Sequence, residues 1–155
     1  MLLAILCLLL GAMFAATPVA LGHAVVQSIT PADGARLTRA PAEVRVSFSE
    51  PVQLLQGRDA SVVTSTGDLV SSGPGEVPSG NAQQVVIPVR AGIGAGSYTA
   101  RWRVVSADGH IVGGASVFAI GDVPMGQPYL GGPGGQGGPS ETSAWAVGAR
   151  WLDLV

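Results

Sequence analysis

Apolar and polar residues alternate with a period of two over long stretches of the chain, and this alternation constrains the fold more than any other feature. Val44, Val46 and Phe48 alternate with arginine and serine, and a second alternating run extends from Tyr98 to Val104. Because successive side chains of a β-strand point to opposite faces, each run predicts a strand with one buried face. Shorter candidate strands are residues 60–64, 69–71, 84–89 and 115–120.

Turn-forming sequences separate these candidate strands. Residues 31–34 (PADG), 65–68 (STGD) and 74–75 (PG) combine the residue types that favour tight turns. Residues 23–122 show no apolar stripe with the spacing and length of a helix, and about 100 residues are enough for one apolar core. We therefore predict a single all-β domain over 23–122 with an Ig-like β-sandwich fold, in which Trp102 anchors the core.

The first 22 residues are predicted to be a secretory signal peptide. Residues 2–16 form an uncharged apolar run, Pro18 follows it, and residues 20–22 (ALG) place small side chains before the expected cleavage site. The alternative is an uncleaved membrane anchor, although the run is shorter than the roughly 20 apolar residues of a spanning helix. No Lys or Arg precedes the run, which departs from the usual signal pattern. Cleavage would make His23 the first residue.

The composition argues against several classes of function. The only cysteine, Cys7, lies in the expected signal peptide, so the exported domain would contain no disulfide. The formal net charge is −2, and the basic residues are all arginine and scattered, which does not favour binding to nucleic acid. The glycines of 131–138 lack the strand, helix and lysine of a phosphate loop. No arrangement of nucleophile, base and orienting acid indicates a hydrolase, and we predict that the protein is not an enzyme.

The chain changes character after Asp122. Residues 123–143 are dominated by proline and glycine in their first part, a composition that predicts a flexible linker. Residues 144–155 form a short apolar tail that contains Trp145, Arg150 and Trp151. Aromatic residues and arginine at the start of an apolar run are typical of a membrane interface, but the tail is too short to cross a bilayer. It is therefore either the beginning of a truncated transmembrane helix or a weakly ordered tail.

The two histidines of the chain combine with an aspartate into a candidate metal site. After cleavage, His23 would offer a metal both its free α-amine and its imidazole. Asp108 and His110 are two residues apart, so in extended backbone they would project from the same face of a sheet, with Gly109 leaving room for a metal. Nitrogen and carboxylate donors of this kind suit Cu(II). The alternative is that His110 is an ordinary surface histidine beside a common Asp-Gly turn.

Four sequence motifs resemble the CopC family of bacterial copper-binding proteins. They are His23-Ala24, residues 30–34 (TPADG), residues 46–51 (VSFSEP), and residues 102–110 (WRVVSADGH) followed by Gly113. The resemblance covers about 100 residues and implies a Greek-key sandwich in the periplasm or outside the membrane. It also implies one Cu(II) ion held by His23, Asp108 and His110, with Glu50 nearby as a hydrogen-bonding group that orients the ligands. The alternative for Glu50 is a glutamate at the end of a strand, facing solvent before Pro51.

The resemblance also bears on partners. Some family members carry a methionine-rich Cu(I) site, but here Met1 and Met13 fall in the signal peptide and Met125 is alone, so no such site is expected. In several bacteria a CopC domain is fused to a CopD-like membrane domain. Residues 149–152 resemble the start of the first helix of such a membrane domain. A copper carrier that delivers Cu(II) to a CopD-like partner, fused or separate, is the leading hypothesis. A metal-free Ig-like interaction module and a copper oxidase that holds copper through an N-terminal histidine are the alternatives.

Overall fold

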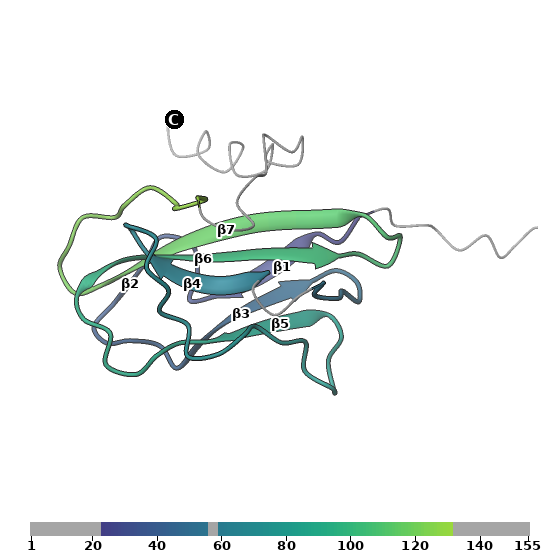
Figure 1. Ribbon diagram of the computed structural model, residues 1–155, viewed down its shortest axis with the longest axis horizontal. Coiled ribbons are helices and arrows are strands. Elements are labelled where there is room, and N and C mark those ends of the chain that lie inside the picture. Colours follow the sequence, from purple (N-terminus) through teal and green to yellow (C-terminus); the bar gives the residue numbers. More distant parts are fainter. Residues whose placement is uncertain (1–22, 56–58, 132–155) are drawn as a thin grey trace, which may run out of the picture.

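The computed structural model describes residues 23–55 and 59–131, which form a β-sandwich of two sheets (Figure 1). One sheet has three strands in the order β1-β3-β5, and the other has four strands in the order β2-β7-β6-β4. The strands are β1 (Val26–Thr30), β2 (Ala35–Leu37), β3 (Glu43–Phe48), β4 (Ala60–Thr64), β5 (Gln84–Pro88), β6 (Gly96–Val105) and β7 (Ile111–Ile120). The predicted all-β sandwich is confirmed. In the described residues no helix is long and apolar enough to cross a membrane.

Most predicted strands are present, with differences at their ends. Strand β4 has the predicted bounds, while β7 begins at Ile111 and so is longer than predicted. The start of β7 was not predicted because it contains the glycines at 113 and 114, yet this stretch pairs with β6 without interruption. The predicted strand over 69–71 is wrong, because there the chain makes only isolated bridges through Leu69 and Ser71 after a tight turn. Strands β1 and β2 were not predicted.

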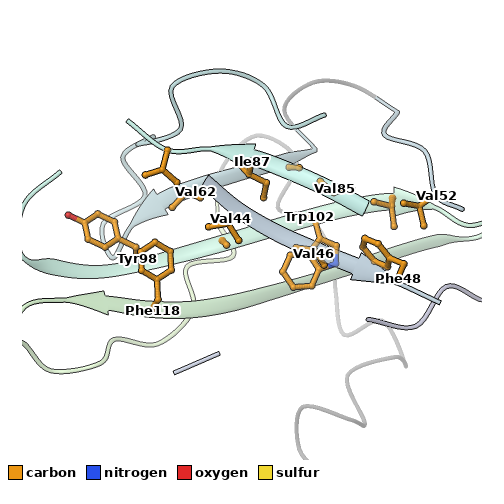
Figure 2. Close-up of a cluster of buried hydrophobic side chains, with 14 of the residues drawn as sticks. Val44, Val46, Phe48, Val52, Val62, Val85, Ile87, Tyr98, Trp102 and Phe118 are labelled. Carbon is orange, nitrogen blue, oxygen red and sulfur yellow. The ribbon is translucent and has the colours of Figure 1, made fainter. Parts of the chain in front are cut away.

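The antiparallel hairpin of β6 and β7 is the longest element of the sandwich. Its register runs from Gly96 opposite Ile120 to Val105 opposite Ile111. Every second residue of β6 points towards the three-stranded sheet, and the core forms where these side chains meet those of β3 and β5 (Figure 2). Trp102 is 2% exposed, which confirms its predicted place in the core. Fully buried side chains of the same core cluster include Val44, Val46, Phe48, Val85, Ile87, Val104 and Phe118.

The end of the core farthest from the β6–β7 turn is closed by two aromatic rings. Tyr98 stacks on Phe118 with ring centroids 5.6 Å apart, and Figure 2 shows the pair at one end of the cluster. The Tyr98 hydroxyl donates a hydrogen bond of 2.8 Å to the carbonyl of Gly94, four residues earlier, as in the tyrosine corner of Ig-like domains. Burial raises the pKa of the Tyr98 hydroxyl above its ordinary value.

Residues 123–131, which we call the strap, lie along the outer face of the four-stranded sheet. Their backbone is hydrogen-bonded to outward side chains of β6 in the pairs Gly126 with Ser97, Tyr129 with Thr99, and Gly131 with Arg101. The strap is the first part of the predicted linker over 123–143, and the bounds and flexibility of that linker stay a prediction. Backbone groups of the strap lie outside any strand ladder, and the hydroxyl and guanidinium groups of β6 give three of them hydrogen-bond partners. The predicted signal peptide and residues 132–155 lie outside the described residues.

Candidate metal centre

The turn that joins β6 to β7 carries two of the three predicted ligands. The Ser106 N–H donates to the carbonyl of His110, and the Gly109 N–H donates to the carbonyl of Ser106, both at 2.9 Å. Gly109 has a φ of +85°, in the left-handed region where a side chain is strained, so glycine is required for this turn. Asp108 and His110 were expected to meet because of extended backbone, but a tight turn brings them together instead.

Pairing of the first strand with β3 places His23 over this turn. The Val25 N–H donates to the Ser49 hydroxyl at 3.0 Å, and the Ser49 N–H donates to the Val25 carbonyl at 2.9 Å. Ala24 is 4% exposed and packs into the core. These contacts fix residues 24 and 25, and Figure 1 shows that the beginning of β1 and the β6–β7 turn lie at the same end of the sandwich. The two ends of the predicted site therefore meet.

His23, Asp108 and His110 form a compact cluster of possible metal ligands. One ligand atom from each residue lies within 4.8 Å of those from the other two. Asp108 Oδ2 is at the centre, 3.0 Å from the backbone nitrogen of His23 and 3.0 Å from His110 Nδ1. His23 Nδ1 is 3.9 Å from the same oxygen, and the two imidazole rings are tilted by 35° with centroids 4.5 Å apart. The cluster thus gathers imidazole nitrogens around one carboxylate oxygen.

Solvent reaches the cluster from outside the sandwich. The side chains of His23 and His110 are 50% and 63% exposed, and that of Asp108 is 27% exposed. Within residues 23–55 and 59–131, half or more of each imidazole is left exposed, so a metal held here would be accessible to an incoming ligand. Transition metals that accept imidazole nitrogen match this donor set better than oxygen-seeking ions such as Ca²⁺ or Mg²⁺.

The hydrogen bonds on Asp108 keep its carboxyl group ionised. Its Oδ1 accepts from the Ser106 hydroxyl and, at 3.1 Å, from the His110 N–H. The Ser106 hydroxyl is the main cause and the His110 N–H the next, and together they hold the pKa of Asp108 well below its usual range. A carboxylate that is already deprotonated binds a cation without first losing a proton.

Glu50, which follows β3, contacts the same turn. Its Oε1 accepts a hydrogen bond of 3.2 Å from the Ala107 N–H, the residue before Asp108. The carboxylate thereby links the end of β3 to the ligand-bearing turn, next to the cluster. This contact supports the predicted role of Glu50 in orienting the ligands, acting through the backbone of the turn, but that role stays a prediction.

Two serines that the sequence analysis did not single out hold the cluster together. Ser106 is 4% exposed and binds Asp108 from beneath the turn, and Ser49 fixes the segment behind His23. The spacing Ser-x-Asp in a turn was a possible signal for Ser106, since short hydroxyl side chains bond to groups two residues on. The methionine of the described residues, Met125, lies in the strap beside the start of β6, at the opposite end of that strand from the cluster.

Comparisons with known sequences point to one family. The family model of the CopC domain matches residues 26–121. The chain is 34% identical over 100 residues to the copper transport protein CutJ of Bacillus subtilis strain 168, a match that covers 64% of this chain and 18% of CutJ. The chain thus spans less than a fifth of the length of that relative. It is 30% identical over 105 residues to the protein YobA of Escherichia coli K12, with 67% of this chain and 83% of YobA covered.

Solved structures show the same fold. The crystal structure of CopC from Methylosinus trichosporium OB3b superimposes with a TM-score of 0.55 at 25% identity, covering 63% of this chain and 93% of that one. PcoC, a methionine-rich copper resistance protein from Escherichia coli, gives a TM-score of 0.53 at 24% identity and covers 64% of this chain and all of PcoC. The two matches show that the β-sandwich of this chain has the fold of CopC and PcoC.

Proposed function

The chain belongs to the CopC family, and from this premise we propose that it is an exported protein of copper homeostasis that binds one Cu(II) ion. The observation that carries the proposal is the meeting of His23 with Asp108 and His110, which are 85 residues or more away in the chain. The family match covers 26–121 and does not include His23, so the position of His23 is independent support.

The ligand set that we propose consists of four donors from three residues. They are the α-amine and imidazole of His23, one carboxylate oxygen of Asp108 and the imidazole of His110. Amine and imidazole nitrogens with a single oxygen form the tetragonal set that Cu(II) favours, and Cu(II) lies at the top of the stability order of divalent first-row metals. Because one residue supplies two donors, ordering His23 once positions both of them.

Cleavage before His23 is part of the proposal, and the backbone supports it. The nitrogen of His23 already lies 3.0 Å from Asp108 Oδ2, so a free amine at this position would face the cluster. In the uncleaved chain His23 has a φ of +76°, which costs a residue with a side chain roughly 1 kcal/mol. This torsion is defined by the carbonyl carbon of the preceding residue, so cleavage would remove both the strain and the bond that blocks the amine.

The exposure of the two imidazoles suits a protein that hands its ion to another molecule. We propose that the domain captures Cu(II) outside the cytoplasmic membrane and passes it to a CopD-like membrane transporter, either fused to it or separate. The match to a small part of CutJ, a copper transport protein, supports an arrangement in which a domain of this kind belongs to a longer transport protein.

The experiment that tests the proposal compares three forms of the chain, and the exported product is first identified by mass spectrometry. One form begins at His23, a second carries one glycine before His23, and a third carries His110→Ala. We expect the first to bind one Cu(II) with nitrogen donors visible by electron paramagnetic resonance, measured together with affinity by chelator competition. The added glycine should remove the amine donor, and His110→Ala should remove an imidazole.

The copper-free melting temperature serves as the control, since none of these changes touches the core. Copper binding that is unaffected by both changes would contradict the proposed site. A metal-free interaction module would show no copper-dependent rise in melting temperature. An oxidase would produce peroxide with ascorbate, and it is disfavoured because the Phe, Tyr and Trp rings of the described residues are buried, apart from Tyr129 in the strap.

A further inference from the structure

We propose that Ser106 is a positioning residue that restricts Asp108 to a single metal-binding oxygen and thereby favours Cu(II) over zinc. The inference rests on the proposed function, because it concerns the same ligand cluster. Ser106 directly follows β6 and is 4% exposed, so it lies beneath the turn and not among the ligands. Its influence on a metal therefore has to pass through Asp108.

The two oxygens of the Asp108 carboxylate face different partners. Oδ1 accepts hydrogen bonds from the Ser106 hydroxyl and from the His110 N–H, which is 3.1 Å away. Oδ2 faces the other ligands, with the His23 nitrogen and His110 Nδ1 each at 3.0 Å. One oxygen is thus bound to the turn, and the other is directed at the place where the nitrogen donors converge.

The Ser106 hydroxyl has one proton and faces two acceptors. The second acceptor is the carbonyl of His110, 3.0 Å away, which already receives the Ser106 N–H at 2.9 Å. The carboxylate is charged and is therefore the stronger acceptor. The turn itself does not depend on the hydroxyl, because its backbone hydrogen bonds remain without it.

A carboxylate held in this way cannot present both oxygens to a metal without losing the Ser106 hydrogen bond. The protein then offers three nitrogens and one oxygen, which is the number and type of donors that tetragonal Cu(II) takes. Zinc takes a tetrahedral set of donors, so a direction of Oδ2 that suits a tetragonal set does not suit zinc equally well. Freeing Oδ1 would let Asp108 rotate, which weakens the copper geometry and leaves zinc less affected.

The test measures Cu(II) and Zn(II) affinities of the chain beginning at His23 and of three variants. In Ser106→Ala the hydroxyl is lost, and we expect copper affinity to fall about 10- to 100-fold, the range typical when a residue that orients a ligand is removed. Zinc affinity should fall by clearly less, so the ratio of Cu(II) affinity to Zn(II) affinity should decrease. Ser106→Thr keeps the hydroxyl and should restore selectivity. Ser61→Ala is the matched control, since Ser61 is also 4% exposed and hydrogen-bonded, to Arg101 in β6.

A second measurement needs no variant. A crystal structure of the copper-loaded chain should show Asp108 bound through Oδ2 alone, with the Ser106 hydroxyl on Oδ1, and a bidentate Asp108 would overturn the inference. Unchanged copper affinity in Ser106→Ala, or an equal loss for both metals, would overturn it as well. Failure of the wild-type chain to bind copper would instead contradict the proposed function, so the two failures are distinguishable.

Discussion

The two ends of the β6–β7 hairpin have opposite properties. At one end, Tyr98 and Phe118 stack inside the core, with Phe118 1% exposed, and the strap covers the outer face of the same strands. At the other end, the turn presents Asp108 and His110 to solvent. The residues that stabilise the sandwich and those that would bind metal are therefore separated along one element. Stability and metal affinity should therefore change independently.

The largest effect is expected from Phe118→Ala, which opens a cavity at the buried end. Removing a fully buried aromatic ring typically costs about 3–5 kcal/mol, so the free energy of unfolding in urea should fall by that amount. Copper affinity of the molecules that remain folded should be unchanged. His110→Ala is the counterpart at the exposed end, and it should abolish tight copper binding while changing stability by no more than about 1 kcal/mol. Equal losses of stability in the two variants would show that the exposed end contributes as much to the fold as the buried end.

Alanine substitutions at two adjacent glycines of β7 test how close to the turn the tightly packed core extends. A Cβ on Gly114 would lie 2.5 Å from Cζ2 of the Trp102 ring, whereas one on Gly113 would meet nothing closer than 3.6 Å. Gly114→Ala should therefore destabilise the domain by about 1–3 kcal/mol, the usual cost of overpacking, as measured by thermal unfolding. Gly113→Ala is the matched control and should be tolerated. If both alanines were equally harmless, the core would be looser near the turn than the structure indicates.

Much of the sandwich was predictable because its inward residues alternate strictly. The alternation of Val44, Val46 and Phe48 identified β3, and that of Tyr98 to Val104 identified β6, since one face of each strand is buried. Strand β1 was missed because none of its residues is fully buried, and β2 because it has only three residues. The start of β7 contains two glycines, which have a low strand propensity, and close packing against the Trp102 ring accounts for Gly114 but not for Gly113.

The three residues of the candidate site were predicted from the sequence, but the contacts that bring them together were not. The proximity of Asp108 and His110 follows from their spacing, but the approach of His23 depends on the pairing of β1 with β3 and on the Ser49 hydrogen bonds. Such contacts between distant segments leave no periodic signal in a sequence. The role of Ser106 was missed for a related reason, because only the turn shows which oxygen of Asp108 it binds.

A smaller loss of stability is expected when the strap is detached from the buried end of the hairpin. Thr99 is 1% exposed, and its hydroxyl accepts the Tyr129 N–H at 2.9 Å. Thr99→Val keeps the shape of the side chain but removes the acceptor, so stability should fall by about 0.5–1.5 kcal/mol and hydrogen exchange of the Tyr129 amide should accelerate. Thr99→Ser retains the hydroxyl and should keep the amide protected. If the Tyr129 amide exchanges equally fast in wild type and in Thr99→Val, the strap does not depend on β6.

The smallest effect is the pH dependence contributed by the exposed end. The pKa of Asp108 is lowered in the folded state, first by the Ser106 hydroxyl, so at acidic pH the unfolded chain binds more protons at this residue. The stabilisation is therefore fully present above the unfolded value of about 3.9 and is lost as the pH falls below it. In urea unfolding of the copper-free chain, the difference between wild type and Asp108→Asn should shrink on acidification below about pH 4. Because Asp108 lies in an exposed turn, solvent screening keeps this difference small. A difference that stayed constant from neutral to acidic pH would show that the carboxylate does not stabilise the turn, and the two ends of the hairpin would then differ even more sharply.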